Sequence, residues 1–324
     1  MNVSQLKRQV ADAACVVASL LIAPASAGAY SNIYFFGDSV SDSGNVALAI
    51  GYPNGVPQVV TGNDYIPDYP YYPSGRYSNG PVWAEVFAAK YGLSAAPSLA
   101  GGTNFAFAGA RTGGPDVPAP TLTTQAGMFL AGTGGSAPSD ARYVIAEVGN
   151  DARDALAAIG AGADVSQTIA SASATYATQL GSLIDTLRAA GASQFLVFEN
   201  VNLGVVPAIT ALGSDASALA SAVTWNMNAA LLSRIHDEAG VRVFDTYSFL
   251  TGVVQNPGAF GFSNATDACG AVVGADCGTY VFWDGLHPTA ALHQLIAASA
   301  VPEPQTLWLF VAGLAGLAWR RRRS

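Results

Sequence analysis

The chain has 324 residues, of which 51% are hydrophobic and only 11% are charged. Disordered chains have few hydrophobic residues and many charges, so intrinsic disorder is excluded. The formal net charge is −8. Six basic and two acidic residues lie in the end segments 1–29 and 301–324, so 8 basic and 20 acidic residues, a net charge of −12, lie between them. Phosphate backbones would repel such a surface, which argues against nucleic acid as a partner.

The first 29 residues have the order of a secretory signal peptide. Lys7 and Arg8 precede an apolar stretch over residues 14–22, and small residues follow at 25–29. A signal peptidase accepts this combination of a basic flank, an apolar region and small residues. A buried first helix is the alternative interpretation, and the order of basic, apolar and small residues favours export.

Strand-like and helical patterns alternate along the rest of the chain. Short β-prone runs predict strands over residues 32–36, 103–107, 143–148, 194–198 and 241–244. Apolar spacing predicts helices over residues 81–91, 165–190, 216–238 and 288–298. This alternation predicts an α/β fold with a mostly parallel, five-stranded sheet covered by helices.

Residues 51–80 interrupt this alternation and are rich in Tyr, Pro, Gly and Asn. Insertions of this length often shape binding sites in α/β folds. The segment contains the tyrosines Tyr65, Tyr69, Tyr71, Tyr72 and Tyr77. They line an acyl or sugar pocket in one interpretation and belong to a well-packed surface loop in the other.

Four turns that follow predicted strands or precede the last helix carry chemically useful residues. They are residues 37–45 with Ser39, residues 108–110, residues 149–151, and residues 284–288. Ligands bind beyond the carboxyl ends of the strands in open α/β sheets, so these turns are expected to meet there. Together they supply a hydroxyl, small residues, an amide and an Asp/His pair, which are the parts of a serine acyl-transfer site.

The chemistry assigns a role to each part. A serine hydroxyl needs a base to take its proton, so we expect Ser39 as nucleophile and His287 as base. Asp284 lies three residues before the histidine and would orient its ring. The backbone N–H groups of Ser39 and Gly109 and the side-chain amide of Asn150 would stabilise the oxyanion. This site requires neither a metal nor a cofactor.

These turns resemble the sequence blocks of the GDSL (SGNH) hydrolases. Residues 36–45 (FGDSVSDSGN) resemble the first block, 104–110 (NFAFAGA) the second, 149–151 (GND) the third and 284–288 (DGLHP) the fifth. Residues 75–83 (GRYSNGPVW) resemble a segment of the larger, lipase-like members. The second block has Ala108 where many members have a glycine.

The resemblance implies a flavodoxin-like, three-layer α/β/α sandwich over residues 30–300 and hydrolysis of carboxylic esters through an acyl-serine. It assigns Ser39, Asp284 and His287 to catalysis, and Ser39, Gly109 and Asn150 to the oxyanion hole. The substrate would be a lipid or an acylated sugar. Two alternatives remain open: an O-acetyl esterase acting on envelope polysaccharide, and a surface binding protein with a vestigial site.

The last segment, residues 301–324, resembles a PEP-CTERM sorting tail. A Val-Pro-Glu-Pro sequence precedes an apolar run over residues 306–319, and four arginines follow at 320–323. The run is short for a membrane span, which needs about 20 residues. The resemblance implies transient membrane contact and cleavage by an exosortase-type enzyme, whereas a plain tail anchor is the alternative. Both place the domain in the periplasm, the cell envelope or outside the cell.

The remaining cysteines and histidines have structural interpretations. Cys269 and Cys277 lie eight residues apart, and in an oxidising compartment this spacing favours a local disulfide over a metal site. His236 and His293 lie on predicted helices away from the four turns, and we expect structural roles for both.

Overall fold

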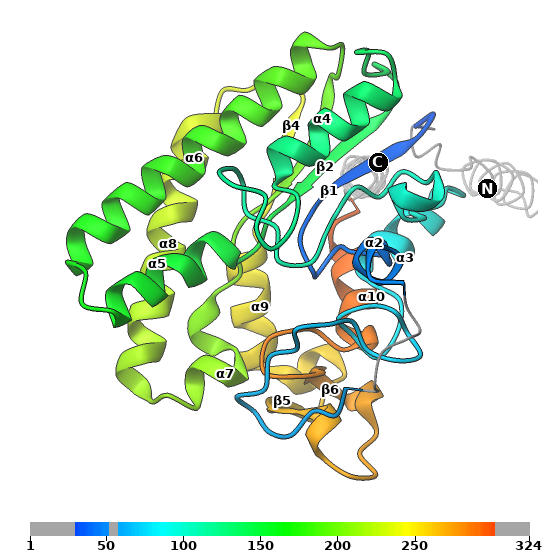
Figure 1. The fold of residues 1–324 in the computed structure, drawn as a ribbon. Coiled ribbons are helices and arrows are strands. Elements are labelled where there is room, and N and C mark those ends of the chain that lie inside the picture. Colours follow the sequence, from blue (N-terminus) through cyan, green and yellow to red (C-terminus); the bar gives the residue numbers. More distant parts are fainter. Residues whose placement is uncertain (1–29, 52–57, 302–324) are drawn as a thin grey trace, which may run out of the picture. The chain divides into compact units, whose positions relative to one another are not determined.

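The computed structural model describes residues 30–51 and 58–301. Its main sheet consists of four parallel strands in the spatial order β1, β2, β3, β4 (Figure 1). The strands are β1 (Ile33–Gly37), β2 (Arg142–Ala146), β3 (Gln194–Phe198) and β4 (Val241–Phe244). All of β2 and most of β1 and β3 are buried, as expected of parallel strands that are covered on both faces. The predictions for residues 1–29 and 302–324 lie outside the described residues.

Helices cover both faces of this sheet (Figure 1). The α-helices of the described residues are α2 (Asn45–Ala49), α3 (Trp83–Ala89), α4 (Leu122–Gly132), α5 (Asn150–Gly160), α6 (Val165–Ala189), α7 (Pro207–Thr210), α8 (Ser214–Ile235), α9 (Thr246–Gln255) and α10 (Ala290–Ser299). Helices α4, α6 and α8 lie on one face, and α3 and α10 lie on the other.

Neighbouring side chains of β1 point to opposite faces of the sheet and contact the helical layer on each face. The ring of Phe35 contacts Trp83 of α3, with the centroids 5.7 Å apart, and the ring of Phe36 contacts Phe129 of α4 at 5.8 Å. Consecutive residues of a strand point to opposite faces, so the two phenylalanines anchor opposite helical layers. The predicted three-layer α/β/α fold is therefore confirmed.

The predicted number of five strands is wrong, because residues 103–107 do not form a regular strand. This segment lies beside β1, joined by three backbone hydrogen bonds of 2.8–3.1 Å, but it forms only an isolated bridge between Asn104 and Phe35. In a regular ladder the N–H of Gly37 would donate to the carbonyl of Phe105, but it donates instead to Oε1 of Gln125 at 2.9 Å, which ends the pairing. The segment occupies the place of a fifth strand without its regular pairing.

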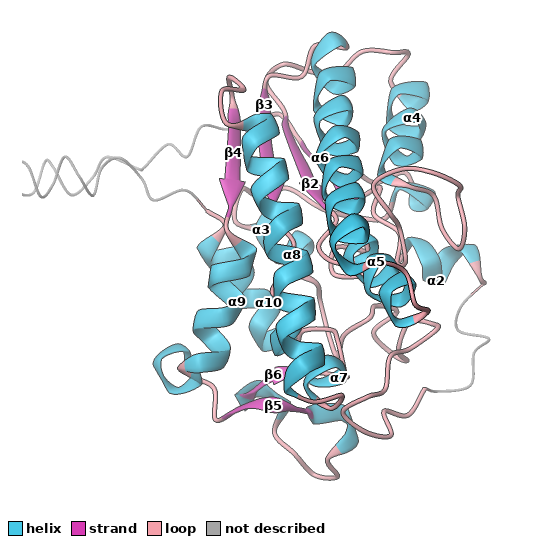
Figure 2. Ribbon diagram, turned by 90° about the vertical axis from the view of Figure 1, so that its left-hand side faces the viewer, coloured by secondary structure: helices cyan, strands magenta, loops and turns pink. Residues whose placement is uncertain are grey.

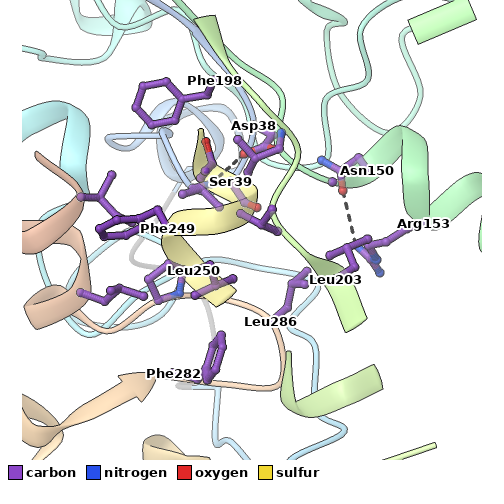
Figure 3. A pocket seen from close by; sticks show the side chains of 18 residues that line it. Asp38, Ser39, Asn150, Arg153, Phe198, Leu203, Phe249, Leu250, Phe282 and Leu286 are labelled. Carbon is purple, nitrogen blue, oxygen red and sulfur yellow. Dashed lines mark hydrogen bonds between the residues drawn. The ribbon is translucent and has the colours of Figure 1, made fainter. Parts of the chain in front are cut away.

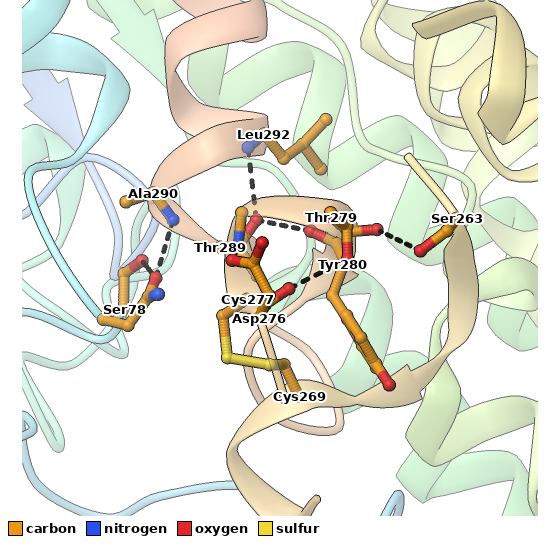
Figure 4. The surroundings of a disulfide bond; sticks show 12 residues. Ser78, Ser263, Cys269, Asp276, Cys277, Thr279, Tyr280, Thr289, Ala290 and Leu292 are labelled. Atoms are coloured by element: carbon orange, nitrogen blue, oxygen red, sulfur yellow. Dashed lines mark hydrogen bonds between the residues drawn. A yellow bond between two sulfur atoms is a disulfide. The ribbon is translucent and has the colours of Figure 1, made fainter. Parts of the chain in front are cut away.

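A small second sheet, which the sequence did not predict, consists of the parallel strands β5 (Asn264–Ala268) and β6 (Tyr280–Phe282) (Figure 2). A disulfide between Cys269 and Cys277 closes the connection between these strands, with the Cα atoms 5.6 Å apart (Figure 4). The chain runs from β6 directly into residues 284–288. The disulfide thus constrains the segment that precedes the expected Asp/His pair.

His293 joins the two helices of one layer. It lies on α10 with no exposed surface, and its Nδ1 accepts a hydrogen bond of 3.1 Å from the backbone N–H of Trp83 on α3. Burial, followed by the charge of His287, lowers the pKa of His293 from 6.5 to about 3. The ring is therefore neutral in the folded protein, in agreement with a structural role.

We expect His293→Asn to reduce the sensitivity of folding to acid. Below pH 6.5 the unfolded chain takes up a proton at His293 that the folded chain binds only near pH 3, so acid favours unfolding across this window. The asparagine keeps an acceptor for Trp83 and does not titrate. Between pH 7 and pH 5 the wild type should lose about 2 kcal/mol more unfolding free energy than the variant. Urea unfolding at both pH values measures this difference, and equal losses would contradict it.

Candidate active site

Ser39 lies in the turn directly after β1 and is 8% exposed. Its Oγ lies 2.9 Å from Nε2 of His287, which follows β6 and lies 248 residues further along the chain. Nδ1 of His287 lies 2.8 Å from Oδ2 of Asp284. The structure therefore brings the predicted nucleophile, base and orienting acid into one hydrogen-bonded chain with the geometry that acyl transfer requires.

The carboxylate of Asp284 is fully buried, and four donors hold it. Oδ1 accepts the backbone N–H groups of Leu286 and His287, both at 2.7 Å. Oδ2 accepts the hydroxyl of Tyr71 at 2.8 Å in addition to the His287 ring. The backbone of the turn thus fixes one oxygen, and the other oxygen connects the imidazole to a tyrosine of the insertion.

The predicted oxyanion donors face a common groove. Ser39, Gly109, Asn150 and His287 all line it. Within the described part of the chain, the backbone N–H groups of Ser39 and Gly109 donate to no other atom. The amide of Asn150 uses one hydrogen for the carbonyl of Ala110 at 3.0 Å, and the second hydrogen remains for a ligand.

Glycine is required at only one of the two positions in the second block. Gly109 has φ +80°, in the left-handed region that disfavours side chains. No non-glycine residue of the described chain has a positive φ, so Ala108 keeps an ordinary backbone conformation. An alanine at position 108 is therefore compatible with the turn that presents the Gly109 N–H.

Two buried carboxylates from the first block connect the turns. Asp38 accepts the N–H groups of Val40 and Val148, both at 2.9 Å, and so joins the Ser39 turn to the end of β2. Asp42 accepts the N–H of Ala108 at 3.1 Å and so joins the same turn to the Gly109 turn. Each connection fixes one oxyanion donor relative to Ser39.

Burial perturbs these carboxyl groups. It raises the pKa of Asp38 to about 6, although the N–H groups of Val148 and Val40 lower it. Burial likewise raises the pKa of Asp42. Burial, together with the charges of Asp151 and Asp38, raises the pKa of Glu147 at the end of β2 well above its usual value.

Glu147 also fixes the start of α5. Its Oε1 accepts the backbone N–H groups of Gly149, Asn150 and Asp151, the first at 3.1 Å and the last at 3.2 Å. These are the first donors of the helix, which have no partner within it. The side chain of Asn150 is therefore presented from a helix start that a buried acid holds in place.

Two unlike cavities adjoin Ser39. The groove described above is open, with a volume of about 860 Å³, and its walls include Tyr69 and Tyr77 from the insertion. The second, which we call the apolar cavity, has a volume of about 50 Å³. Phe249, Leu250 and Phe282 are among the side chains that surround it (Figure 3).

The insertion packs closely against the catalytic turn. The N–H of Gly285 donates to the carbonyl of Tyr65 at 2.8 Å, and Ser78 Oγ donates to the carbonyl of Pro288 at 2.8 Å. A Cβ atom at Gly285 would lie 2.5 Å from the carbonyl oxygen of Asn63, so only glycine fits there. The tyrosines of the insertion are divided between the groove wall, which includes Tyr69 and Tyr77, and buried packing, which includes Tyr71.

The sequence indicated no individual role for several site residues, and it placed Tyr71 only among the tyrosines of the insertion. Tyr71, Glu147 and Arg153 have no motif of their own, and Asp38 and Asp42 lie in the first block without an assigned role. Aspartates in turn segments often accept nearby backbone N–H groups, and the two aspartates flank the short turn of residues 39–41, so this spacing is a signal for such caps. Within residues 30–51 and 58–301, no cluster of His, Cys, Asp and Glu could hold a metal ion.

The end of the chain matches the PEP-CTERM protein-sorting motif over residues 300–323. This motif indicates an exported protein that associates with the cell envelope. Across the residues that the structure describes, no helix has both the length and the apolar character needed to cross a bilayer.

The comparisons with known proteins agree with the site. The family model of the GDSL-like lipases/acylhydrolases matches residues 33–300. Similar curated proteins include GDSL esterase/lipase At1g73610 of Arabidopsis thaliana, 28% identical over 84% of this chain and 88% of the relative. GDSL esterase/lipase At1g28580 of the same plant is 26% identical over 86% of each chain. The resemblance of the four turns is thereby confirmed, and the chain belongs to the GDSL-like lipase/acylhydrolase family.

Proposed function

We propose that this protein is an exported serine hydrolase that cleaves carboxylic esters through an acyl-serine intermediate. One observation carries the proposal: Ser39, His287 and Asp284 form a continuous hydrogen-bonded chain at a groove that also contains the oxyanion donors. The family supports a hydrolase acting on esters.

The acylation step uses the observed contacts in order. Nε2 of His287 takes the Ser39 proton while Oγ attacks the ester carbonyl carbon. The resulting oxyanion accepts hydrogen bonds from the N–H groups of Ser39 and Gly109 and from the amide of Asn150. When the bond to the alcohol oxygen breaks, the proton on His287 passes to that oxygen, and the acyl group remains on Ser39. Asp284 stabilises the imidazolium that exists between the two proton transfers.

Deacylation repeats these steps with water. His287 takes a proton from water, the hydroxide formed attacks the acyl carbon, and the same donors hold the second oxyanion. The proton then returns from His287 to Ser39 Oγ as the acid leaves. The enzyme is restored without any other reactant.

We also propose how the ends of the chain are processed. Residues 1–29 would be removed by signal peptidase, and an exosortase-type enzyme would cleave near Pro302-Glu303-Pro304. The match of the sorting motif to residues 300–323 supports the second cleavage. The hydrolase domain would then act in the envelope or outside the cell.

Ser39→Ala should abolish ester hydrolysis and labelling by a fluorophosphonate probe. The variant keeps the fold and the groove but lacks the attacking oxygen, so kcat should fall by about 10⁴-fold or more. Hydrolysis of a short-chain p-nitrophenyl ester and gel fluorescence of the probe measure both effects. Ser248→Ala, at an exposed serine on α9, is the matched control and should change neither.

Equal activity of the wild type and Ser39→Ala would refute the nucleophile. A folded wild type that neither hydrolyses esters nor reacts with the probe would instead support a binding protein with a vestigial site.

Tyr71 acts in this proposal as a positioning residue. It is 2% exposed, and its hydroxyl shares Oδ2 of Asp284 with the His287 ring. Its ring packs edge-on against Trp283, with the centroids 5.5 Å apart, so the hydroxyl has little freedom to turn away. The carboxylate is therefore held at a fixed angle to the imidazole by a residue far from the catalytic motif.

Tyr71→Phe should lower kcat by about ten-fold and leave KM unchanged, because it removes a hydrogen bond to a charged group that does not touch substrate. Steady-state kinetics with one ester measures the two constants, and thermal unfolding checks the fold. Tyr65→Phe removes a hydroxyl from the same segment that contacts Gln58 instead of Asp284, and it should retain full kcat. A folded Tyr71→Phe protein with unchanged kcat would exclude the positioning role.

A further inference from the structure

The groove and the apolar cavity meet at three residues, Ser39, Asn150 and Arg153. The nucleophile and one oxyanion donor therefore belong to both spaces. Nη1 of Arg153 lies 3.4 Å from Oδ1 of Asn150 at the same boundary (Figure 3). An ester bound at Ser39 has an acyl part and an alcohol part, and the groove and the apolar cavity are positioned to receive one part each.

The position of His287 indicates which part of the ester enters the groove and which part enters the apolar cavity. The leaving alcohol must take its proton from Nε2 of His287, so the alcohol has to lie next to this ring. His287 lines the groove and is not among the residues that line the apolar cavity. The alcohol therefore occupies the groove, and the acyl chain extends from Ser39 into the apolar cavity.

We propose that the protein prefers short acyl chains esterified to bulky, hydroxyl-rich alcohols. This inference rests on the proposed ester hydrolysis at Ser39. The apolar cavity has a volume of about 50 Å³. Since one water-sized group needs about 10–15 Å³, it holds about four such groups, which corresponds to an acyl chain of roughly two to four carbons.

Regular elements fix the limit of the apolar cavity. Its walls include Phe198 at the end of β3, Phe249 and Leu250 of α9, and Leu292 of α10. Three of these side chains are at least 94% buried, and the ring of Phe249 packs on Phe244 with the centroids 5.4 Å apart. Packed interiors resist expansion, so a longer chain would have to displace an anchored side chain.

The groove has a mixed lining, in which polar and charged groups stand among apolar residues such as Ile50, Ile66 and Pro120. Its walls combine the rings of Tyr69 and Tyr77 with Asp68 and with the ion pair of Arg111 and Asp154, whose nearest atoms lie 2.7 Å apart. Aromatic faces beside charged donors and acceptors suit an alcohol that offers both C–H surface and many hydroxyl groups. Its volume of about 860 Å³ admits a residue far larger than the acyl chain.

The first test is a chain-length series of p-nitrophenyl esters with the full protein. We expect kcat/KM for the acetyl to butyryl esters to exceed that for the octanoyl ester by about 100-fold. A maximum at octanoyl or longer would overturn the short-chain inference while leaving ester hydrolysis intact. Loss of hydrolysis at every length, without probe labelling of Ser39, would refute the proposed function instead.

Two variants then change the apolar cavity in opposite directions. Phe249→Ala enlarges it and should reduce the butyryl-to-octanoyl ratio by about ten-fold. Val201→Phe, at a half-buried lining position, should fill it and leave acetyl esters as the best substrates. Phe260→Ala removes the same side chain as the first variant at a site that is 40% exposed, and it should retain the wild-type ratio. Unchanged ratios in both folded cavity variants would overturn the assignment of the acyl chain to this cavity.

The groove is tested with one acyl group on two alcohols. Tyr69 is 56% exposed, so Tyr69→Ala should fold normally. It should raise KM for an acetylated oligosaccharide about five- to ten-fold and leave KM for ethyl acetate unchanged. Equal effects on both substrates, or no effect on either, would contradict the placement of the alcohol.

Discussion

The site depends on buried carboxylates that accept backbone N–H groups at the ends of parallel strands. Asp38 connects the turn after β1 to the end of β2, and Asp42 connects it to the turn that contains Gly109. Asp284 likewise fixes its own turn by accepting the backbone N–H groups of Leu286 and His287. An oxyanion hole is effective only if its donors are positioned before the charge develops. The proposed donors lie on separate segments, and acidic side chains between the segments hold them in place.

This arrangement has a cost in stability. The folded protein raises the pKa of Asp38 from 3.8 to about 6, so it holds the proton of this carboxyl group more tightly than the unfolded chain does. The contribution of Asp38 to the free energy of unfolding is therefore fully present below pH 3.8 and is lost as the pH rises through 6. At neutral pH the ionised carboxylate costs about 3 kcal/mol relative to an unperturbed one. The buried His293 has the opposite dependence, because acid favours its unfolded form. The extensive apolar core of the three layers offsets the cost of the ionised Asp38 and that of the neutral His293. The fold can therefore keep several acidic side chains buried although the chain has few charged residues.

The sequence predicted the residues of the hydrogen-bonded chain at Ser39 better than it predicted their surroundings. Ser39, Asp284 and His287 lie in short turns whose motifs are local, and buried parallel strands have clear apolar runs. Residues 103–107 have the composition of a strand, yet the side chain of Gln125 takes the N–H of Gly37 that a regular ladder would give to this segment, and no local pattern shows this. Tyr71 reaches Asp284 across 213 residues of sequence, and its role depends entirely on how the insertion folds back. Strand β5 is likewise short and polar and strand β6 has only three residues, so neither has a pattern that identifies it, and both gain order from tertiary packing.

In the proposed function, reaction type and substrate choice therefore depend on different parts of this chain. The nucleophile, base and oxyanion donors come from four turns, and each turn carries its own motif. The apolar cavity is built from the end of β3, from α9 and from α10, whose inward-facing residues are indistinguishable in sequence from ordinary core. The groove takes Tyr69 and Tyr77 from an insertion with no periodicity. Substitutions in these surrounding elements can alter which ester fits without disturbing the hydrogen-bonded chain from Asp284 to Ser39, so chains that share the four turns need not share a substrate.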